Sequence, residues 1–345
     1  MDRPRLLTPA GNGLIQSAGM SRRSMLGLGA AAVAALAVPG CSRGRSDEPA
    51  PAGPATLATG NKGGVYDEFG GGLAKLVSEV TGMELQTVPS GGSVDNLYRV
   101  AGMKNDLGFT TSDTALNAYE GTGLFSSGAL KFTALARTYD NYVHVVVPTA
   151  SDVVLLKHLA GKTVNVGPMN SGTKVVADLI LNTSKLSGVR TTNYTLEEAV
   201  KQLKVRADNQ GKGPGIDALI WSGGLPTKPI AELQASVGFR LVDIGTVAEE
   251  ISLKRFGGYV VSSIPPSVYG LASSVPTLAV PNYLIARPNL SDSWAWWTVN
   301  TMFRRQNDLM AAHQEAGSLD PRSAIATMPI PLHPAAERWY RANHI

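Results

Sequence analysis

Short apolar segments that end in glycine-, serine- and threonine-rich turns and lead into amphipathic helices recur along this chain. Residues 55–58 are apolar and reach the turn Thr59-Gly60, and the apolar residues of 65–80 then follow helical spacing. The same order of strand, turn and helix returns at 83–101 and again at 162–186. Because strands that alternate with helices of this length pair mainly in parallel, the pattern predicts an α/β fold.

The chain has 345 residues, more than one compact core usually takes, and its two cycles of alternating elements predict two lobes. We expect each lobe to be a doubly wound, mostly parallel sheet with helices on both faces. A strand at 277–286 would return the chain to the first lobe, where a long helix at 291–310 would pack. Lobe 1 is therefore expected to comprise 55–139 and 272–345, and lobe 2 to comprise 140–271.

Polar residues interrupt the apolar pattern in the middle of the chain. Asp140-Asn141 separate two apolar segments, which predict two strands at 132–138 and 142–147. A helix is expected to follow at 152–159. We place the crossings between the lobes, and therefore the hinge, near 139–143 and 262–275.

The positive charge of the chain is concentrated at its N-terminus. The formal net charge is +4, and the first 40 residues carry four arginines against the single Asp2. The rest of the chain is nearly neutral, which argues against a nucleic-acid partner. Arg22-Arg23 precede a stretch without charge from Ser24 to Ser42, which is typical of a twin-arginine signal peptide over residues 1–40.

The only cysteine, Cys41, follows small residues at the end of this stretch. Its place resembles a bacterial lipobox, in which the cysteine becomes lipidated; an anchored helix with an incidental cysteine is the alternative. Residues 41–54, rich in proline and glycine, predict a disordered tether. We expect an exported protein, lipid-anchored on the outer face of the cytoplasmic membrane, with Met1 or Met20 as its first residue.

Sequence motifs of the common enzyme chemistries are absent. The five histidines form no pair with metal-ligand spacing, and no G-x-S-x-G elbow occurs. Gly161-Lys162-Thr163 is not a phosphate-binding loop, because Leu156 stands where its first glycine is required. We therefore predict no enzyme activity, no metal and no cofactor. An exported lipoprotein hydrolase with a serine nucleophile is the less favoured alternative.

Five turns rich in Gly, Ser and Thr join strands to helices, at 59–64, 89–93, 110–113, 170–173 and 221–224. In open α/β sheets the ligand crevice lies beyond the carboxyl ends of the strands, and helix N-terminal N–H groups there suit a carboxylate or phosphate. Each helix end contributes only about 0.3–1 kcal/mol, so several must converge to hold a small acid. The alternative is that these are ordinary loops, in which Gly and Ser serve backbone geometry.

Segments at these turns and beyond resemble motifs of the TAXI class of TRAP-transporter solute-binding proteins. In family order they are Thr59-Gly60 with Gly63-Gly64 and Tyr66, Pro89 to Leu97, Asp106 to Asp113, Val166 to Thr173, Asp217 to Pro226, Ile264-Pro265 with Tyr269, and Leu332 to Pro334 with Trp339-Tyr340. They cover nearly the whole chain after the tether. Lys62 and an insertion at 211–215 depart from the pattern.

This resemblance implies a two-lobed periplasmic-binding-protein fold (type II-like) that closes on a small organic acid. The acid would be glutamate-like or dicarboxylic, and the protein, a monomer, would deliver it to a TRAP-type membrane permease. A ligand-binding sensory partner of a membrane receptor kinase is the alternative role.

The turns and the resemblance together select a set of ligand-binding residues. They are Thr59, Gly60, Tyr66, Ser93, Asn96, Ser112, Asp113, Ser171, Gly172, Thr173, Trp221 and Gly223. Helix capping is the alternative role for Ser93, Asn96 and Ser112.

Individual roles follow from residue type. Tyr66 would close over the ligand or donate its hydroxyl, and residues 171–173 would offer N–H groups at a helix start. Trp221 would form an apolar wall, and Gly223 would let the backbone approach the ligand closely. Two lysines, Lys62 and Lys174, are candidate counter-charges. Three tryptophans at 294, 296 and 297 are expected to pack or to form a partner surface.

Overall fold

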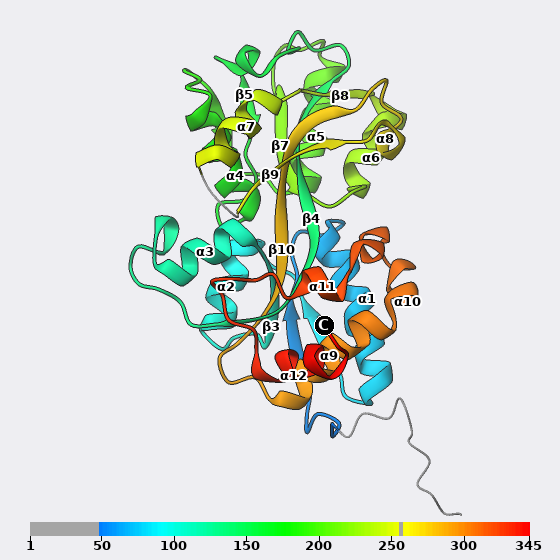
Figure 1. Ribbon diagram of the computed structural model, residues 1–345. Helices are drawn as coiled ribbons and strands as arrows, with labels where there is room; N and C mark the ends of the chain where they lie inside the picture. The colour runs from blue at the N-terminus through cyan, green and yellow to red at the C-terminus, as the bar shows by residue number, and fades with distance from the viewer. Residues whose placement is uncertain (1–47, 255–257) are drawn as a thin grey trace, which may run out of the picture. The chain divides into compact units, whose positions relative to one another are not determined.

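The computed structural model describes residues 48–254 and 258–345, and its strands and helices alternate as the sequence predicts (Figure 1). The strands are β1 (Ala55–Ala58), β2 (Leu85–Val88), β3 (Leu107–Thr111), β4 (Thr133–Pro148), β5 (Thr163–Asn165), β6 (Arg190–Thr192), β7 (Ala218–Gly223), β8 (Phe239–Leu241), β9 (Val260–Ile264) and β10 (Val275–Ala286).

The helices include three short 3₁₀ turns, η1 to η3. They are α1 (Val65–Thr81), α2 (Ser93–Ala101), α3 (Ser112–Glu120), η1 (Gly123–Phe125), η2 (Leu156–Leu159), α4 (Gly172–Thr183), α5 (Leu196–Asp208), α6 (Lys228–Ser236), α7 (Gly245–Lys254), α8 (Pro266–Tyr269), α9 (Asp292–Arg304), α10 (Gln306–Met310), η3 (Gln314–Ser318), α11 (Pro321–Ala324) and α12 (Pro334–Ala342). Among the described residues, no helix is long and apolar enough to cross a membrane.

Two lobes share one sheet, and we name the lower part of Figure 1 lobe 1 and the upper part lobe 2. In lobe 1, β2, β1 and β3 are parallel, and in lobe 2, β6, β5 and β7 are parallel. The long strands β4 and β10 are antiparallel to each other and run through both lobes. Each lobe is therefore a mixed sheet, with parallel strands on one side of the antiparallel crossing strands.

Strand β4 is one continuous strand of 16 residues, so the prediction of two separate strands at 132–138 and 142–147 is wrong. Its first half pairs with β10, and its second half pairs with β7 and β8. The polar residues Asp140-Asn141 lie inside the strand, at the point where its partner changes from β10 to β7. They mark a crossing between the lobes and do not end the strand.

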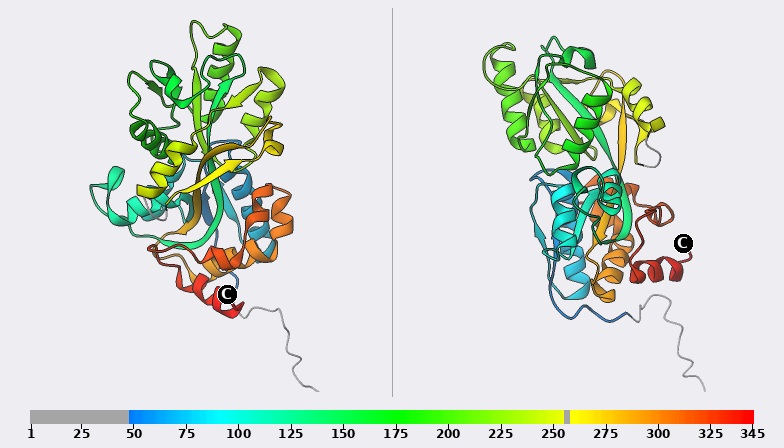
Figure 2. Two further views of the ribbon diagram at one scale, coloured as in Figure 1. Left: turned by 45° about the horizontal axis from the view of Figure 1, so that its top comes forward. Right: turned by 90° about the vertical axis from the view of Figure 1, so that its left-hand side faces the viewer.

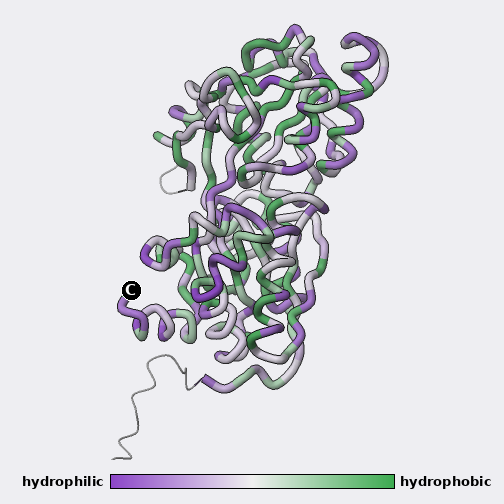
Figure 3. The backbone as a smooth tube through the Cα atoms, turned by 90° about the vertical axis from the view of Figure 1, so that its right-hand side faces the viewer, coloured by the Kyte–Doolittle hydropathy of each residue, from purple (hydrophilic) through white to green (hydrophobic). Residues whose placement is uncertain are grey.

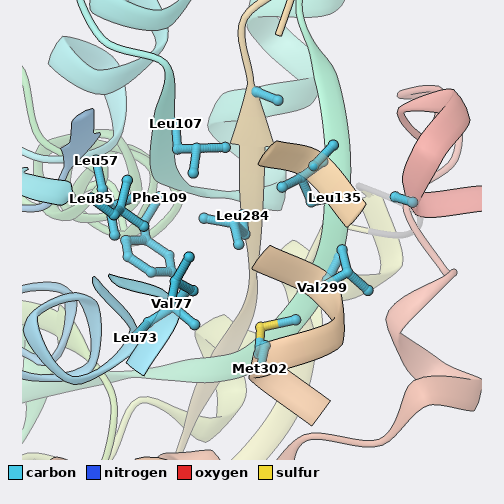
Figure 4. Packing of buried hydrophobic residues seen from close by; sticks show 14 of the residues in the cluster. Leu57, Leu73, Val77, Leu85, Leu107, Phe109, Leu135, Leu284, Val299 and Met302 are labelled. Atoms are coloured by element: carbon cyan, nitrogen blue, oxygen red, sulfur yellow. The ribbon is translucent and has the colours of Figure 1, made fainter. Parts of the chain in front are cut away.

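Each lobe buries apolar side chains on both faces of its sheet. In lobe 1, Leu284 of β10 packs with α1 and α9 on one face (Figure 4), while Ile285 packs with α2 and α3 on the other. In lobe 2, Val145 of β4 packs with α4 and α7, and Val146 packs with α5 and α6. Because successive strand residues point to opposite faces, this alternation covers each sheet on both sides, as Figure 2 shows. Hydrophobic stretches run through both lobes in Figure 3.

Two predicted helices differ from the structure. Residues 152–159, expected to be helical, form only the 3₁₀ turn η2 at their end. The helix expected at 291–310 breaks at Arg305 into α9 and α10. Arg305 has φ −111° and ψ 26°, outside the α-helical range.

The segment expected to be a disordered tether is fixed where it is described, from Glu48 onward. The indole N–H groups of Trp294 and Trp297 donate to the carbonyls of Gly53 and Pro49, each at 3.0 Å. Arg338 in α12 lies 3.5 Å from the carboxylate of Glu48. Composition alone does not reveal these partners, because they stand 241 to 290 residues further along the chain. The predicted signal peptide, Cys41 and both candidate start residues lie outside the described residues.

Candidate functional site

A small cavity lies between the lobes, beyond the carboxyl ends of β1, β3, β5 and β7. Its volume is about 40 Å³. The described residues that line it are Gly60, Asn61, Gly64, Val65, Tyr66, Gly92, Ser93, Thr111, Tyr139, Asn141, Ser171, Gly172, Thr173, Trp221, Ser222 and Gly223.

Three helices begin at this cavity: α1 and α2 from lobe 1 and α4 from lobe 2. Their N-cap residues, Gly64, Gly92 and Ser171, all line it. The N–H groups of a first helical turn have no partner within the helix, and the helix dipole places partial positive charge there. These helix starts favour negative charge in the cavity from both lobes.

The lobe 1 wall is organised around Tyr66. Its hydroxyl donates to Oδ1 of Asn282 at 2.5 Å, and its ring stacks on Phe109 with the centroids 5.2 Å apart. The amide nitrogen of Asn282 in turn donates to Oδ1 of Asn141 at 2.9 Å and to the Tyr139 carbonyl at 3.0 Å. Burial raises the pKa of Tyr66 well above its usual value, so its hydroxyl stays a donor.

The lobe 2 wall is the indole of Trp221, which a buried chain of hydrogen bonds holds in place. Its N–H donates to Oγ1 of Thr227 at 3.1 Å, and the Thr227 N–H donates to the hydroxyl of Tyr269 at 2.9 Å. That hydroxyl lies 2.9 Å from Nε2 of His144. Gly223 makes room for this indole, because a Cβ there would come within 2.3 Å of the Trp221 nitrogen. The sequence predicts that a ligand approaches the backbone at Gly223. In the structure the indole of Trp221 occupies that space.

His144 is a neutral link in this chain. Its Nδ1 lies 2.9 Å from the Tyr142 carbonyl, to which it must donate, so Nε2 accepts from the Tyr269 hydroxyl. Complete burial lowers the pKa of His144 to about 4.

The two lobes approach each other closely at Gly172, the first residue of α4. A Cβ at this position would lie 2.6 Å from Oγ of Ser93 and 3.0 Å from Oγ1 of Thr111, both in lobe 1. Nearby, the Asp95 N–H donates to the Asn170 carbonyl across the cleft at 3.1 Å. The absence of a side chain at Gly172 is what allows the lobes to meet here.

Two residues that line the cavity have buried hydroxyls without a hydrogen-bond partner in the part of the chain that the structure describes. They are Tyr139 and Ser222. Buried polar groups in folded proteins are nearly always paired, so such atoms need an explanation. A polar ligand that reaches these hydroxyls would supply their partner.

None of the described residues that line the cavity is charged. Lys174, a candidate counter-charge, forms an ion pair with Asp178 instead, and Lys62 is exposed. The described residues also contain no cluster of side chains suited to a metal ion. An anion here would therefore be held by backbone N–H groups and neutral donors.

The predicted site residues fall into two groups. Gly60, Tyr66, Ser93, Ser171, Gly172, Thr173, Trp221 and Gly223 line the cavity. Thr59, Asn96, Ser112 and Asp113 do not.

The second group makes structural contacts. Asn96 is fully buried and donates to the carbonyls of Thr59 and Phe109, both at 2.7 Å. Ser112 donates to the Gly258 carbonyl at 3.3 Å, and Asp113 accepts from the Tyr259 hydroxyl at 2.6 Å. These two residues therefore join α3 of lobe 1 to lobe 2.

Sequence reasoning missed the cavity residues that come from β4. Tyr139, Asn141 and their partner Asn282 lie in strands and not in turns at helix starts. The sequence holds a signal for Asn141 and Asn282, since polar residues in the middle of an otherwise buried strand need partners.

Comparisons with known proteins agree with this architecture. The NMT1-like family matches residues 57–343 of the chain. The structure is similar to that of MatC from Rhodopseudomonas palustris with bound malate, at 14% identity and a TM-score of 0.54, covering 84% of this chain and 99% of that one. It is also similar to the periplasmic aliphatic sulphonate binding protein SsuA from Escherichia coli, at 13% identity and a TM-score of 0.47, covering 85% and 84%. The expected periplasmic-binding-protein-like fold is confirmed.

Proposed function

Because this chain belongs to the NMT1-like family, we propose that it is an extracytoplasmic solute-binding protein that captures a small organic acid between its two lobes. The observation that carries this proposal is the convergence of three helix N-termini, from both lobes, on one cavity. The protein acts by binding and not by catalysis.

An acid fits this site better than a neutral or cationic ligand. Each helix end stabilises a negative charge by about 0.3–1 kcal/mol at a surface and by up to about 2 kcal/mol when partly buried. Three such ends together favour one carboxylate over a neutral group by roughly 1–6 kcal/mol. Trp221 would cover the apolar part of the ligand.

We favour a dicarboxylic or glutamate-like acid as the ligand. The malate bound to MatC supports this choice, as does the resemblance of the turns to TAXI-class proteins. On the same resemblance we propose delivery to a TRAP-type permease. Export by the twin-arginine signal and lipidation at Cys41 would place the protein on the outer face of the membrane.

Binding would proceed by closure of the lobes about the crossing strands β4 and β10. The hinge that we propose lies near Asn141 and Asn282, where the two strands leave one lobe for the other. The lobes that move would correspond to the predicted 55–139 with 272–345 and 140–271, except that residues 272–281 would move with lobe 2, because Leu278 and Val280 pack in its core. Ligand contacts from both lobes would stabilise the closed state.

The proposal is tested by thermal unfolding of the purified protein with malate, succinate, glutamate and a neutral sugar. A ligand that binds only the native state at 100 times its Kd adds about 2.7 kcal/mol of stability. We expect the Tm to rise with at least one acid and to stay unchanged with the sugar. A shift with the sugar alone would refute the assignment of an acid.

Two variants test the site itself by calorimetry with the acid that shifts the Tm. Tyr139→Phe and Ser222→Ala each remove one free hydroxyl, and each should weaken binding about tenfold. Tyr119→Phe and Ser126→Ala are matched controls on exposed side chains of lobe 1. Binding by both site variants that equals that of the controls would place the ligand elsewhere.

A further inference from the structure

A second contact between the lobes lies behind the cavity wall, where η3 of lobe 1 meets the turn that follows β7. Oε1 of Glu315 accepts from the Leu225 N–H at 2.5 Å. The Gln314 side chain donates to the Leu225 carbonyl at 3.1 Å, and Nε2 of His313 lies 3.2 Å from the Pro226 carbonyl. Three consecutive residues of lobe 1 thus hold two consecutive residues of lobe 2.

This contact is continuous with the ligand cavity. Leu225 follows Gly223-Gly224, and Gly223 lines the cavity. A Cβ at Gly224 would lie 2.9 Å from Cγ of Glu315 and 3.1 Å from the ring of Tyr139, which also lines the cavity. The position of the Glu315 side chain therefore fixes where the wall of lobe 2 stands relative to Tyr139.

We propose that Glu315 is a positioning residue for ligand capture: with His313 and Gln314 it holds the turn after β7 against lobe 1 and sets the free energy of closure. This inference rests on the proposed function, because it supposes that the lobes open and close around a ligand. The contact that it adds to the proposed function, between residues 313–315 and the turn after β7, does not touch the ligand.

The surroundings of Glu315 make this contact sensitive to pH. Burial raises the pKa of Glu315 to about 7, and the Leu225 N–H opposes this rise. The charged and titratable groups that face it are Asp140, Tyr139 and Tyr142 of β4, Tyr269 of α8 and the neighbouring His313. Asp140 is itself paired with Arg137 at 2.8 Å, and Glu68 of α1 lies 3.9 Å from His313.

His313 responds to pH in the opposite sense. Its Nδ1 accepts from the Glu315 N–H at 3.1 Å, so Nε2 must carry the proton that is donated to Pro226. The contact therefore requires a neutral ring, and burial lowers the pKa of His313.

The sign of the pH dependence follows from these two directions. In an open form Glu315 would titrate near its ordinary value of 4.5. Closure then takes up a proton below pH 7, so falling pH favours closure by up to about tenfold per unit. Below about pH 6.5 protonation of His313 in the open form opposes this gain. Closure should therefore strengthen as pH falls from 8 to 6.5 and change little below that.

The test is hydrogen exchange of the Leu225 amide in the ligand-free protein, followed by mass spectrometry of a peptide over 222–228. Glu315→Ala removes the acceptor, and exchange should become about tenfold faster. Glu315→Gln keeps an oxygen that accepts from Leu225 but cannot ionise, and protection should return to within a few-fold of the wild type. Glu249→Ala and Glu249→Gln, at an exposed glutamate of α7, are the matched controls.

Exchange is then compared at pH 8, 7 and 6, each time relative to the Glu315→Gln variant, which cancels the intrinsic pH dependence of exchange. The wild type should gain protection over the variant as pH falls. A wild-type profile parallel to that of Glu315→Gln, or unchanged protection in Glu315→Ala, would overturn the proposal. Because no ligand is present, failure to bind an acid leaves this result intact, and the two proposals fail separately.

Discussion

Single glycines decide how closely the two lobes approach each other. A Cβ at Gly172 would lie 2.6 Å from Oγ of Ser93 across the cleft, so a side chain there requires Ser93 or the lobe to shift. The residues at such helix starts were predictable, because Gly, Ser and Thr before an amphipathic segment mark an N-terminus. That Gly172 serves the approach of the other lobe was not predictable, since it depends on which segments of lobe 1 lie opposite.

Gly172→Ala tests this residue directly. The added methyl group should hold the lobes apart and weaken acid binding by tenfold or more, while the free energy of unfolding changes little, because alanine suits a first helical turn. The matched control is Gly71→Ala in α1, where nothing lies within 4 Å of the new Cβ; it should stabilise the fold by about 0.5–1 kcal/mol and leave binding unchanged. Calorimetry and urea unfolding give both quantities. Wild-type affinity in Gly172→Ala would mean that closure does not bring α4 against Ser93.

At the scale of elements, the sequence predicts those whose ends carry local signals. Helix α1 ends where Thr81-Gly82 predicts, and Gly82 has the left-handed conformation (φ 69°) that a glycine C-cap adopts. Helix α5 was not predicted, although Thr195 caps it by accepting from the Glu198 N–H, because its exposed face is densely charged and hides the apolar spacing. The length of β4 was unpredictable locally, since Asn141 finds its partners at Asn282 of β10 and Ser222 of β7.

The hydrogen bond between His144 of β4 and Tyr269 of α8 leads to a prediction about stability and pH. The pKa of its ring is about 4 in the folded protein against 6.5 when unfolded, so the unfolded state binds more protons between these values. Stability should therefore fall by about 3 kcal/mol as pH drops from 6.5 to 4 on account of this residue. Urea unfolding of His144→Gln should show a flatter profile over this range, whatever its stability at pH 7. His158→Gln, at a partly exposed ring, is the control, and equal slopes in all three proteins would contradict the assignment.

At the scale of the whole molecule, the site depends on pairings that a sequence pattern does not contain. Asn282 joins Tyr66 to Asn141. It lies 216 positions after Tyr66 and 141 positions after Asn141 along the chain. Their meeting follows from the register of β10 against β3 and β4, which only the assembled sheet determines. The turns at helix starts predicted a cleft for an anion. One of the two residues there whose hydroxyl has no partner, Tyr139, comes from the crossing strand β4 and not from a turn.

The size of the cavity then has a consequence for the whole molecule. The cavity has a volume of only about 40 Å³, and contacts at Asn170 and at Glu315 join the lobes on two sides of it. We therefore expect a ligand to enter when the lobes separate and the lobes to close around it. Small-angle X-ray scattering should show a smaller radius of gyration with a saturating acid than without it at pH 8, where an ionised Glu315 disfavours closure. Gly172→Ala should contract less than the wild type, and an unchanged radius in the wild type with ligand bound would rule out closure as the mechanism of capture.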